Sequence, residues 1–109
     1  MQKVSISKEE TLSNCNLDKT LKIIGGKWKL VILWYVAQST LRFSDLEKKI
    51  DGITQKMLAQ SLRELEKDGL VSRKVYPVVP PKVEYSITQR GVSLGKVLKE
   101  LDRWGSQEK

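Results

Sequence analysis

The chain has 109 residues, of which 20 are Lys or Arg and 13 are Asp or Glu, so its formal net charge is +7 and its sequence pI is near 9.6. This length accommodates a single domain, residues 1–109, rather than a two-domain enzyme. The chain has no histidine and one cysteine, Cys15, which excludes the usual zinc sites and any Ser–His or Cys–His nucleophile pair. We therefore expect no enzymatic activity, no metal and no cofactor.

The positive charge favours an anionic partner such as nucleic acid, although a solubilising surface would also account for it. No membrane partner is expected, because the longest apolar run, residues 30–37, is far shorter than the roughly 20 residues of a spanning helix. Residues 1–16 contain no apolar block of the kind found in signal peptides, which predicts a cytoplasmic protein.

The first part of the chain predicts a polar arm, residues 1–14, followed by two helices. Ser7 and Glu10 have the spacing of a capping box, so the arm could hold a short helix. The first helix after the arm ends at a Gly25-Gly26 break, and its apolar face carries Leu17, Leu21 and Ile24. The second, from Lys27 to Ala37, is apolar almost all round, with a buried side predicted at Trp28, Val31, Ile32 and Tyr35 and flanking positions at Leu33 and Trp34.

Two further helices follow in close succession. Residues 44–47, SDLE, form a second capping-box pattern, which starts a short helix that stops at Asp51-Gly52. Thr54 is the predicted N-cap of a longer helix that ends at Asp68-Gly69. Its apolar stripe is Leu58, Leu62 and Leu65, and the opposite, outward face carries Lys56, Gln60, Arg63 and Lys67.

The last part predicts a hairpin and a final helix. Residues 71–76 and 83–87 have the composition of strands, and the prolines between them belong in a turn. Thr88 is the predicted cap of the final helix, residues 88–105. The apolar stripe of this helix follows the spacing i, i+3, i+4, i+7 and i+10 through Leu94, Val97, Leu98, Leu101 and Trp104.

A short helix, a tight turn, a longer helix and then a hairpin is the element order of a winged helix-turn-helix, a mainly α fold with a small β-hairpin. The longer helix would then enter the DNA major groove. Gln55 and Gln60 suit an adenine edge, whereas Lys56 and Arg63 suit guanine or phosphate. The predicted contacts on this helix are Thr54, Gln55, Lys56, Gln60 and Arg63, and those of the wing and backbone are Ser44, Arg73, Lys74, Tyr76 and Lys82.

Each of these assignments has a plainer alternative. The polar face of the helix would also suit ordinary solvent exposure. Basic residues and prolines in the hairpin would also protect an edge strand against aggregation. Because the fold does not fix the function, a protein-interaction or RNA-associated winged helix is the rival hypothesis to a DNA-binding transcription regulator.

Residues 15–105 resemble the HxlR family of bacterial transcription regulators. The resemblance lies in the order and spacing of Cys15, GGKW at 25–28, RFSDL at 42–46, GITQKML at 52–58, LRELEKDGL at 62–70, PPKVEY at 80–85, Thr88 and Gly91. It implies a MarR-like winged-helix homodimer that binds a palindromic operator on double-stranded DNA. The N- and C-terminal helices would form the dimer interface, with contacts from Leu17, Leu21, Leu98, Leu101 and Trp104.

The residues support a dimer independently, since two apolar helices offer more hydrophobic surface than one thin core needs. In the alternative, the final stripe packs within one protomer.

The resemblance also implies a role for Cys15, because several family members sense oxidants or electrophiles through a cysteine near the N-terminus. Lys19 and Lys22 follow it, and positive charge favours the reactive thiolate. Cys15 is thus a candidate redox sensor, with a thiol-reactive small molecule as a possible partner. Asn16 stands where the family usually has proline, and an inert thiol is the alternative.

Overall fold

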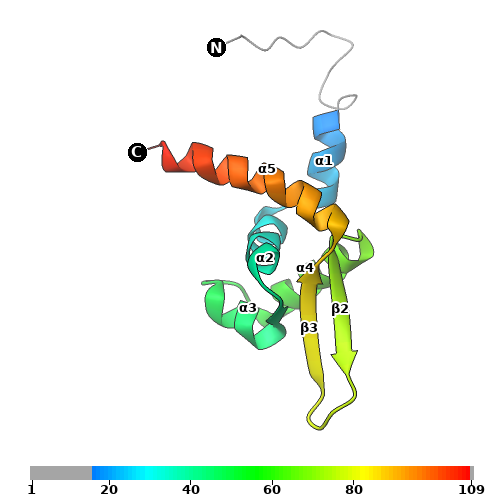
Figure 1. Cartoon of the computed structure of the whole chain (residues 1–109). Helices are drawn as coiled ribbons and strands as arrows, with labels where there is room; N and C mark the ends of the chain where they lie inside the picture. Colours follow the sequence, from blue (N-terminus) through cyan, green and yellow to red (C-terminus); the bar gives the residue numbers. More distant parts are fainter. Residues whose placement is uncertain (1–15, 109) are drawn as a thin grey trace.

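The computed structural model describes residues 16–108, and within this stretch it contains five helices and one three-stranded antiparallel sheet (Figure 1). The elements are α1 (Asn16–Ile24), α2 (Lys27–Gln38), β1 (Leu41–Arg42), α3 (Phe43–Lys49), α4 (Gln55–Lys67), β2 (Val71–Tyr76), β3 (Lys82–Ile87) and α5 (Gln89–Ser106). The predicted winged helix-turn-helix is confirmed. The helix proposed for the arm at Ser7 to Glu10 lies outside the described residues.

The two threonine caps are confirmed. The Oγ1 atom of Thr54 accepts a hydrogen bond from the Met57 amide at 3.1 Å, which starts α4. At the other end of α4, Gly69 takes a φ of 75°, a left-handed conformation that suits glycine. The Oγ1 atom of Thr88 accepts from the Gly91 amide at 3.0 Å and starts α5. These caps fix where α4 and α5 begin.

The predicted cap of α3 at Ser44 is wrong. The helix already begins at Phe43, and the Arg42 amide donates to the Asp45 carboxylate at 2.9 Å. The cause is β1, a two-residue strand that the sequence reading missed, in which Leu41 pairs with Tyr85 and Arg42 with Glu84. Because the chain passes directly from this strand into the helix, Ser44 lies inside the first turn.

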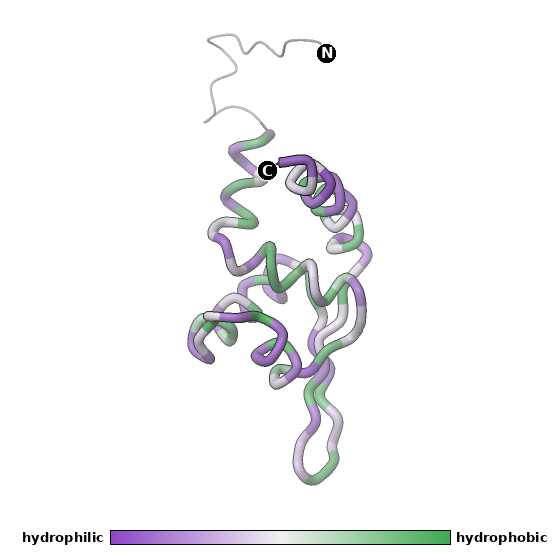
Figure 2. Tube along the Cα trace, turned by 90° about the vertical axis from the view of Figure 1, so that its left-hand side faces the viewer, coloured by the Kyte–Doolittle hydropathy of each residue, from purple (hydrophilic) through white to green (hydrophobic). Residues whose placement is uncertain are grey.

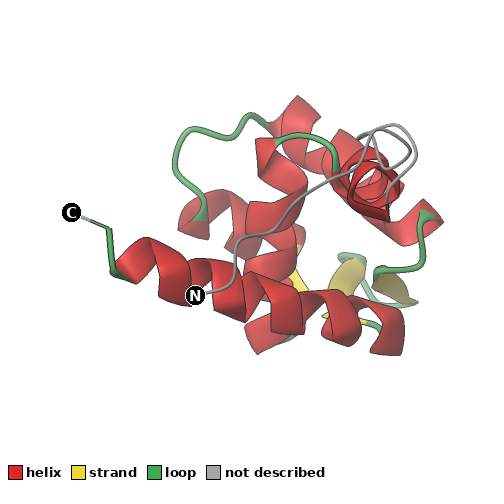
Figure 3. Cartoon of the chain, turned by 90° about the horizontal axis from the view of Figure 1, so that it is seen from above, coloured by secondary structure: helices red, strands yellow, loops and turns green. Residues whose placement is uncertain are grey.

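The core lies where α2 packs on α4, α5 and the sheet. Seen from above, the helices crowd together over the strands (Figure 3). In α2 the buried residues are Ile32, Leu33 and Val36. This corrects the predicted buried side, since Trp28, Val31 and Tyr35 are only partly buried. An all-round apolar helix has no periodicity that selects a face, so its neighbours decide which side is buried. The predicted stripe of α4, Leu58, Leu62 and Leu65, is confirmed, with each residue at most 1% exposed.

The sheet order is β1-β3-β2, and β2 and β3 form a hairpin that projects from the body. In Figure 1 this hairpin points away from the end of the molecule where α1 and the last turns of α5 lie. Figure 2 shows apolar and polar residues alternating along α1 and α5 at that upper end. The hairpin and the exposed apolar residues of α1 and α5 therefore lie at opposite ends of the molecule.

Candidate nucleic-acid interface

The first candidate surface is the outward face of α4. Gln55, Lys56, Gln60 and Arg63 are all exposed, while the opposite face of the helix is buried. No acidic residue occupies the first turn of α4, so the partial positive charge of the helix N-terminus is not offset there. Thr54 is exposed too, and because its oxygen accepts from Met57, its hydroxyl proton remains free to donate. The structure thus presents the predicted reading face to solvent.

The register of the hairpin divides the predicted wing residues between two faces. Residues directly opposite each other in an antiparallel pair point to the same side, and successive residues alternate. Arg73 lies opposite Tyr85, whereas Lys74 lies opposite Glu84 and Tyr76 opposite Lys82. The sequence reading treated these residues as one group, but Arg73 belongs to the face that also carries Tyr85 and Leu41. Lys74, Tyr76 and Lys82 belong to the other.

The second of these faces, the outer face, holds a compact polar cluster around Glu84. The Tyr76 hydroxyl donates to Glu84 Oε1 at 2.8 Å, and Lys82 Nζ lies 3.4 Å from Glu84 Oε2. The Nζ atoms of Lys74 and Lys82 each lie 4.9 Å from the centre of the Tyr76 ring. The hydrogen bond from Tyr76, followed by the charges of Lys82 and Arg42, lowers the pKa of Glu84 below its ordinary value. The cluster holds Tyr76 and Lys82 in fixed positions.

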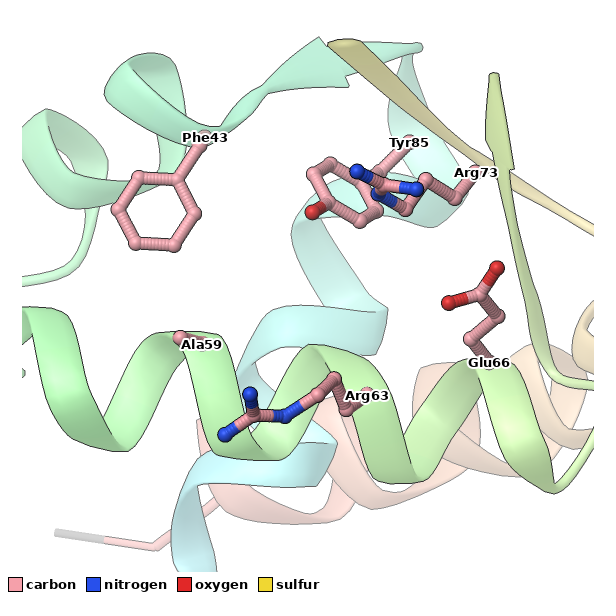
Figure 4. A pocket seen from close by; sticks show the side chains of 6 residues that line it. All are labelled: Phe43, Ala59, Arg63, Glu66, Arg73 and Tyr85. Carbon is pink, nitrogen blue, oxygen red and sulfur yellow. The ribbon is translucent and has the colours of Figure 1, made fainter. Parts of the chain in front are cut away.

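The inner face of the hairpin forms one wall of a cleft (Figure 4). The cleft has a volume of about 370 Å³, and the predicted residues Arg63 and Arg73 both line it. Sequence reasoning missed the rest of its lining, which is Phe43, Ala59, Glu66 and Tyr85. Alternation along β3 could have placed Tyr85 on one side of the sheet, but its pairing with Arg73 depends on the register.

Ser44 is exposed in the first turn of α3, on the helix that precedes the turn into α4. Its side chain is therefore accessible, although α3 contributes Phe43 rather than Ser44 to the cleft.

The second candidate surface lies at the upper end. Leu17, Leu21, Leu101 and Trp104 are 57%, 45%, 55% and 64% exposed. Leu98, which was grouped with them, differs, because it is 6% exposed and belongs to the protomer's own core. Val92 and Val97 on α5 are exposed apolar residues that were not among the predicted dimer contacts, although Val97 belongs to the predicted apolar stripe.

Cys15 lies outside the described residues and directly precedes Asn16, the first residue of α1. Within residues 16–108, no three His, Cys, Asp or Glu side chains come together in a way that would hold a metal ion. No helix in the same stretch is long and apolar enough to cross a membrane.

These features define a helix-turn-helix protein with a β-hairpin wing. The profile of the HxlR-like helix-turn-helix family matches residues 23–109. The uncharacterized HTH-type transcriptional regulator YkvN of Bacillus subtilis is 53% identical over 92 residues, which cover 84% of this chain and 78% of YkvN. The chain belongs to the HxlR family. It is a transcriptional regulator and not an enzyme.

Two solved structures have the same fold. The redox regulator HypR in its oxidized form superposes with a TM-score of 0.83 at 42% identity, over 87% of this chain and 98% of HypR. The reduced form of the transcriptional regulator YodB from Bacillus subtilis superposes with a TM-score of 0.73 at 34% identity, over 84% of this chain and 90% of YodB.

Proposed function

We propose that this regulator binds a palindromic DNA operator as a homodimer, with α4 in the major groove and the β2–β3 hairpin beside it. The observation that carries the proposal is the exposed, basic and amide-bearing face of α4, backed by a fully buried stripe. A major groove about 12 Å wide admits one helix. The N-terminal half of α4 is the part free to reach base edges.

The roles of individual residues follow from their chemistry. Gln55 and Gln60 can each pair with the N6 and N7 edge of adenine, and Lys56 can donate to guanine or to a phosphate. Contacts with the DNA backbone would come from hydroxyl and cationic groups around this helix, namely Ser44, Thr54, Lys74, Tyr76 and Lys82. These backbone contacts give affinity that depends on salt but not on base sequence.

The homodimer is proposed from the upper surface. Four large apolar side chains, Leu17, Leu21, Leu101 and Trp104, are about half exposed or more, and such a patch on a small protein marks an interface. A second copy would cover it by two-fold symmetry. The two α4 helices would then read half-sites about one DNA turn apart, roughly 34–36 Å, or a multiple of this spacing. A regulator that binds chromosomal DNA must be in the cytoplasm of a bacterial cell, which supports the predicted cytoplasmic location.

We also propose that a thiol-reactive oxidant controls the dimer through Cys15. The support is likeness to HypR and YodB, of which HypR is a redox regulator and YodB has been solved after diamide treatment. Joining two Cys15 thiols in one disulfide removes two electrons and two protons, which a diazene such as diamide accepts. The bridge would lie next to α1, where it could change the dimer geometry.

The test is a fluorescence-anisotropy titration of duplexes tiled across the gene's upstream region, with reduced and diamide-treated protein. We expect one tile to bind at least about 10³-fold more tightly than scrambled DNA, and oxidation to change that binding in the wild type but not in Cys15→Ser. Binding that ignores oxidant would remove the thiol switch. Equal binding to all tiles and to RNA would favour the rival interaction module.

A further inference from the structure

The cleft between α4 and the hairpin combines two guanidinium groups with two aromatic rings. Arg63 comes from α4 and Arg73 from β2, so each wall of the cleft supplies one cation (Figure 4). Phe43 and Tyr85 give it apolar surface, and Tyr85 is 9% exposed. At about 370 Å³, the cleft lies at the small end of the range for ligand sites.

Neither arginine of the cleft is in a salt bridge within the part of the chain that the structure describes, whereas Glu64 and Glu84 are paired with lysines. Glu66 also lines the cleft, but Figure 4 shows the Arg63 guanidinium turned away from it and towards Ala59. In the same view the Arg73 guanidinium lies beside the Tyr85 ring, and the Glu66 carboxylate lies on the side of the cleft nearer to Arg73. The short side chain of Ala59 leaves room for an anion beside Arg63.

We infer that this cleft seats one backbone phosphodiester of the operator, held between Arg63 and Arg73. The inference rests on the proposed function and sharpens it. With α4 in the major groove and the hairpin towards the minor groove, the strand that separates the two grooves must pass between them. Arginine forks match the paired oxygens of a phosphate. Arg63, which suited either guanine or phosphate, is thereby assigned to the backbone.

Ala59 and Arg73 acquire roles through this arrangement. Ala59 keeps the seat open, because a longer side chain there would fill the space without removing charge. Arg73 acts from the inner face of the hairpin, apart from Lys74 on the outer face. Base choice then falls to Gln55, Lys56 and Gln60. In this arrangement Arg73 anchors the hairpin to the DNA backbone near α4, in addition to the proposed contacts of Tyr76 and Lys82 beside the turn.

The experiment uses operator duplexes in which one phosphate at a time is replaced by a neutral methylphosphonate. We expect one position per half-site at which this change weakens wild-type binding by about 10-fold or more. Arg63→Ala and Arg73→Ala should each bind the unmodified operator about 10-fold more weakly than the wild type does. For these variants, the methylphosphonate at that position should weaken binding by less than about 2-fold more. Ala59→Leu should behave like them, although it keeps every charge.

Lys99→Ala is the matched control, because it removes one exposed charge from α5 and should keep the full methylphosphonate effect. Arg63→Lys should recover part of the affinity, since it restores the charge without the fork. Unchanged thermal melting of each variant shows that the loss is not one of folding.

Two results would overturn the seat while leaving the operator proposal intact. One is an Arg63→Ala variant that responds to every methylphosphonate as the wild type does. The other is an Arg63→Ala variant that loses discrimination at one base pair, which makes Arg63 a base reader. If the wild type selects no duplex, the operator proposal fails. The seat is then tested on random DNA. Each arginine variant should lower the slope of log affinity against log salt concentration by about 1, and an unchanged slope would contradict the phosphate seat.

Discussion

The two ends of the molecule differ in how deeply their large apolar side chains are buried. Around α4, Leu58, Leu62 and Leu65 are at most 1% exposed and the outer surface is polar. At the upper end, α1 buries no residue at all, and Leu101 and Trp104 of α5 are more than half exposed. The end that carries α4 is thus stabilised by the protomer's own core, whereas the upper end leaves large apolar side chains uncovered, as the proposed dimer requires.

The largest expected effect comes from shortening one leucine at each end. Leu62→Ala should lower the free energy of unfolding by about 2–5 kcal/mol, because it leaves a cavity in the core. Leu101→Ala removes the same atoms from an exposed site and should change the stability of a dilute protomer by only about 0.5 kcal/mol. Urea denaturation at several protein concentrations measures both.

The concentration series separates the two ends further. The loss from Leu62→Ala should be the same at every concentration. If the proposed dimer forms, the effect of Leu101→Ala should grow with protein concentration, because dimerisation stabilises the folded protomer by mass action. Equal losses for both variants in dilute solution would mean that Leu101 is a core residue after all.

A second contrast uses two glycines of α5. A Cβ atom at Gly91 would overlap the Leu70 carbonyl oxygen and lie 2.6 Å from Ile87 Cγ1, whereas at Gly105 it would meet nothing within 4 Å. Gly91→Ala should therefore destabilise the protein by about 1–3 kcal/mol, since backbone must move. Gly105→Ala should stabilise the helix by up to about 1 kcal/mol.

Thermal unfolding followed by circular dichroism would measure both glycine variants. A Gly91→Ala protein as stable as the wild type would show that α5 does not pack closely on the chain at Leu70. The contrast between the helix start, fixed to the body, and the free helix end would then disappear.

Sequence patterns predicted the bounds of α4 and α5 well because their signals are local. Thr54 and the leucine spacing of α4 lie within a few turns of each other, and the same is true of Thr88 and α5. Both helices begin where these residues indicated. Of the cleft, the sequence named only Arg63 and Arg73.

The remaining features depend on distant pairing. β1 has two residues, and it is a strand only because Leu41 and Arg42 pair with Tyr85 and Glu84. No local propensity indicates so short an element. The separation of Arg73 from Lys74 also follows from register. Likewise, Leu98 and Leu101 follow one helical pattern, and only the position of α2 makes the first a core residue.

A third prediction concerns a polar contact that joins the two ends. Lys29 Nζ donates to the Ile23 carbonyl of α1 at 3.3 Å and lies 3.4 Å from Glu64 Oε1 of α4. The Lys29 side chain is 11% exposed and that of Glu64 is 46% exposed. Glu64→Gln should lower the free energy of unfolding by about 0.5–1 kcal/mol, because it leaves the mostly buried Lys29 ammonium without its anion. The loss is small because solvent already screens the Glu64 carboxylate.

A double-mutant cycle with Lys29→Met makes this prediction specific. Methionine keeps the apolar stem and removes the charge, so the double variant should recover part of the loss caused by Glu64→Gln. Strictly additive effects in urea denaturation would show that the two side chains do not interact. The contact through Lys29 would then not link α1 to α4.

The smallest expected effect concerns the outer face of the hairpin, where partly buried polar groups rather than apolar ones link β2 to β3. The pKa of Glu84 is lowered from 4.5, first by the hydrogen bond from Tyr76 and then by Lys82 and Arg42. A carboxyl whose pKa is lower in the folded state stabilises that state above its unfolded value. This contribution is therefore fully present above about pH 4.5, and it is lost as the pH falls through the lowered pKa. Association through the apolar upper surface should not follow this titration.

NMR titration of the Glu84 side-chain carboxyl carbon would measure this pKa directly. Tyr76→Phe should raise it towards 4.5, because the hydrogen bond from Tyr76 is the largest single cause of the shift, and Lys82→Met should raise it as well. Lys96→Met, on α5, is the matched control and should leave the Glu84 pKa unchanged. If Tyr76→Phe also left it unchanged, the hydroxyl would not hold Glu84. Tyr76 would then contribute to the hairpin mainly through its ring, which lies 4.9 Å from the Nζ atoms of both Lys74 and Lys82.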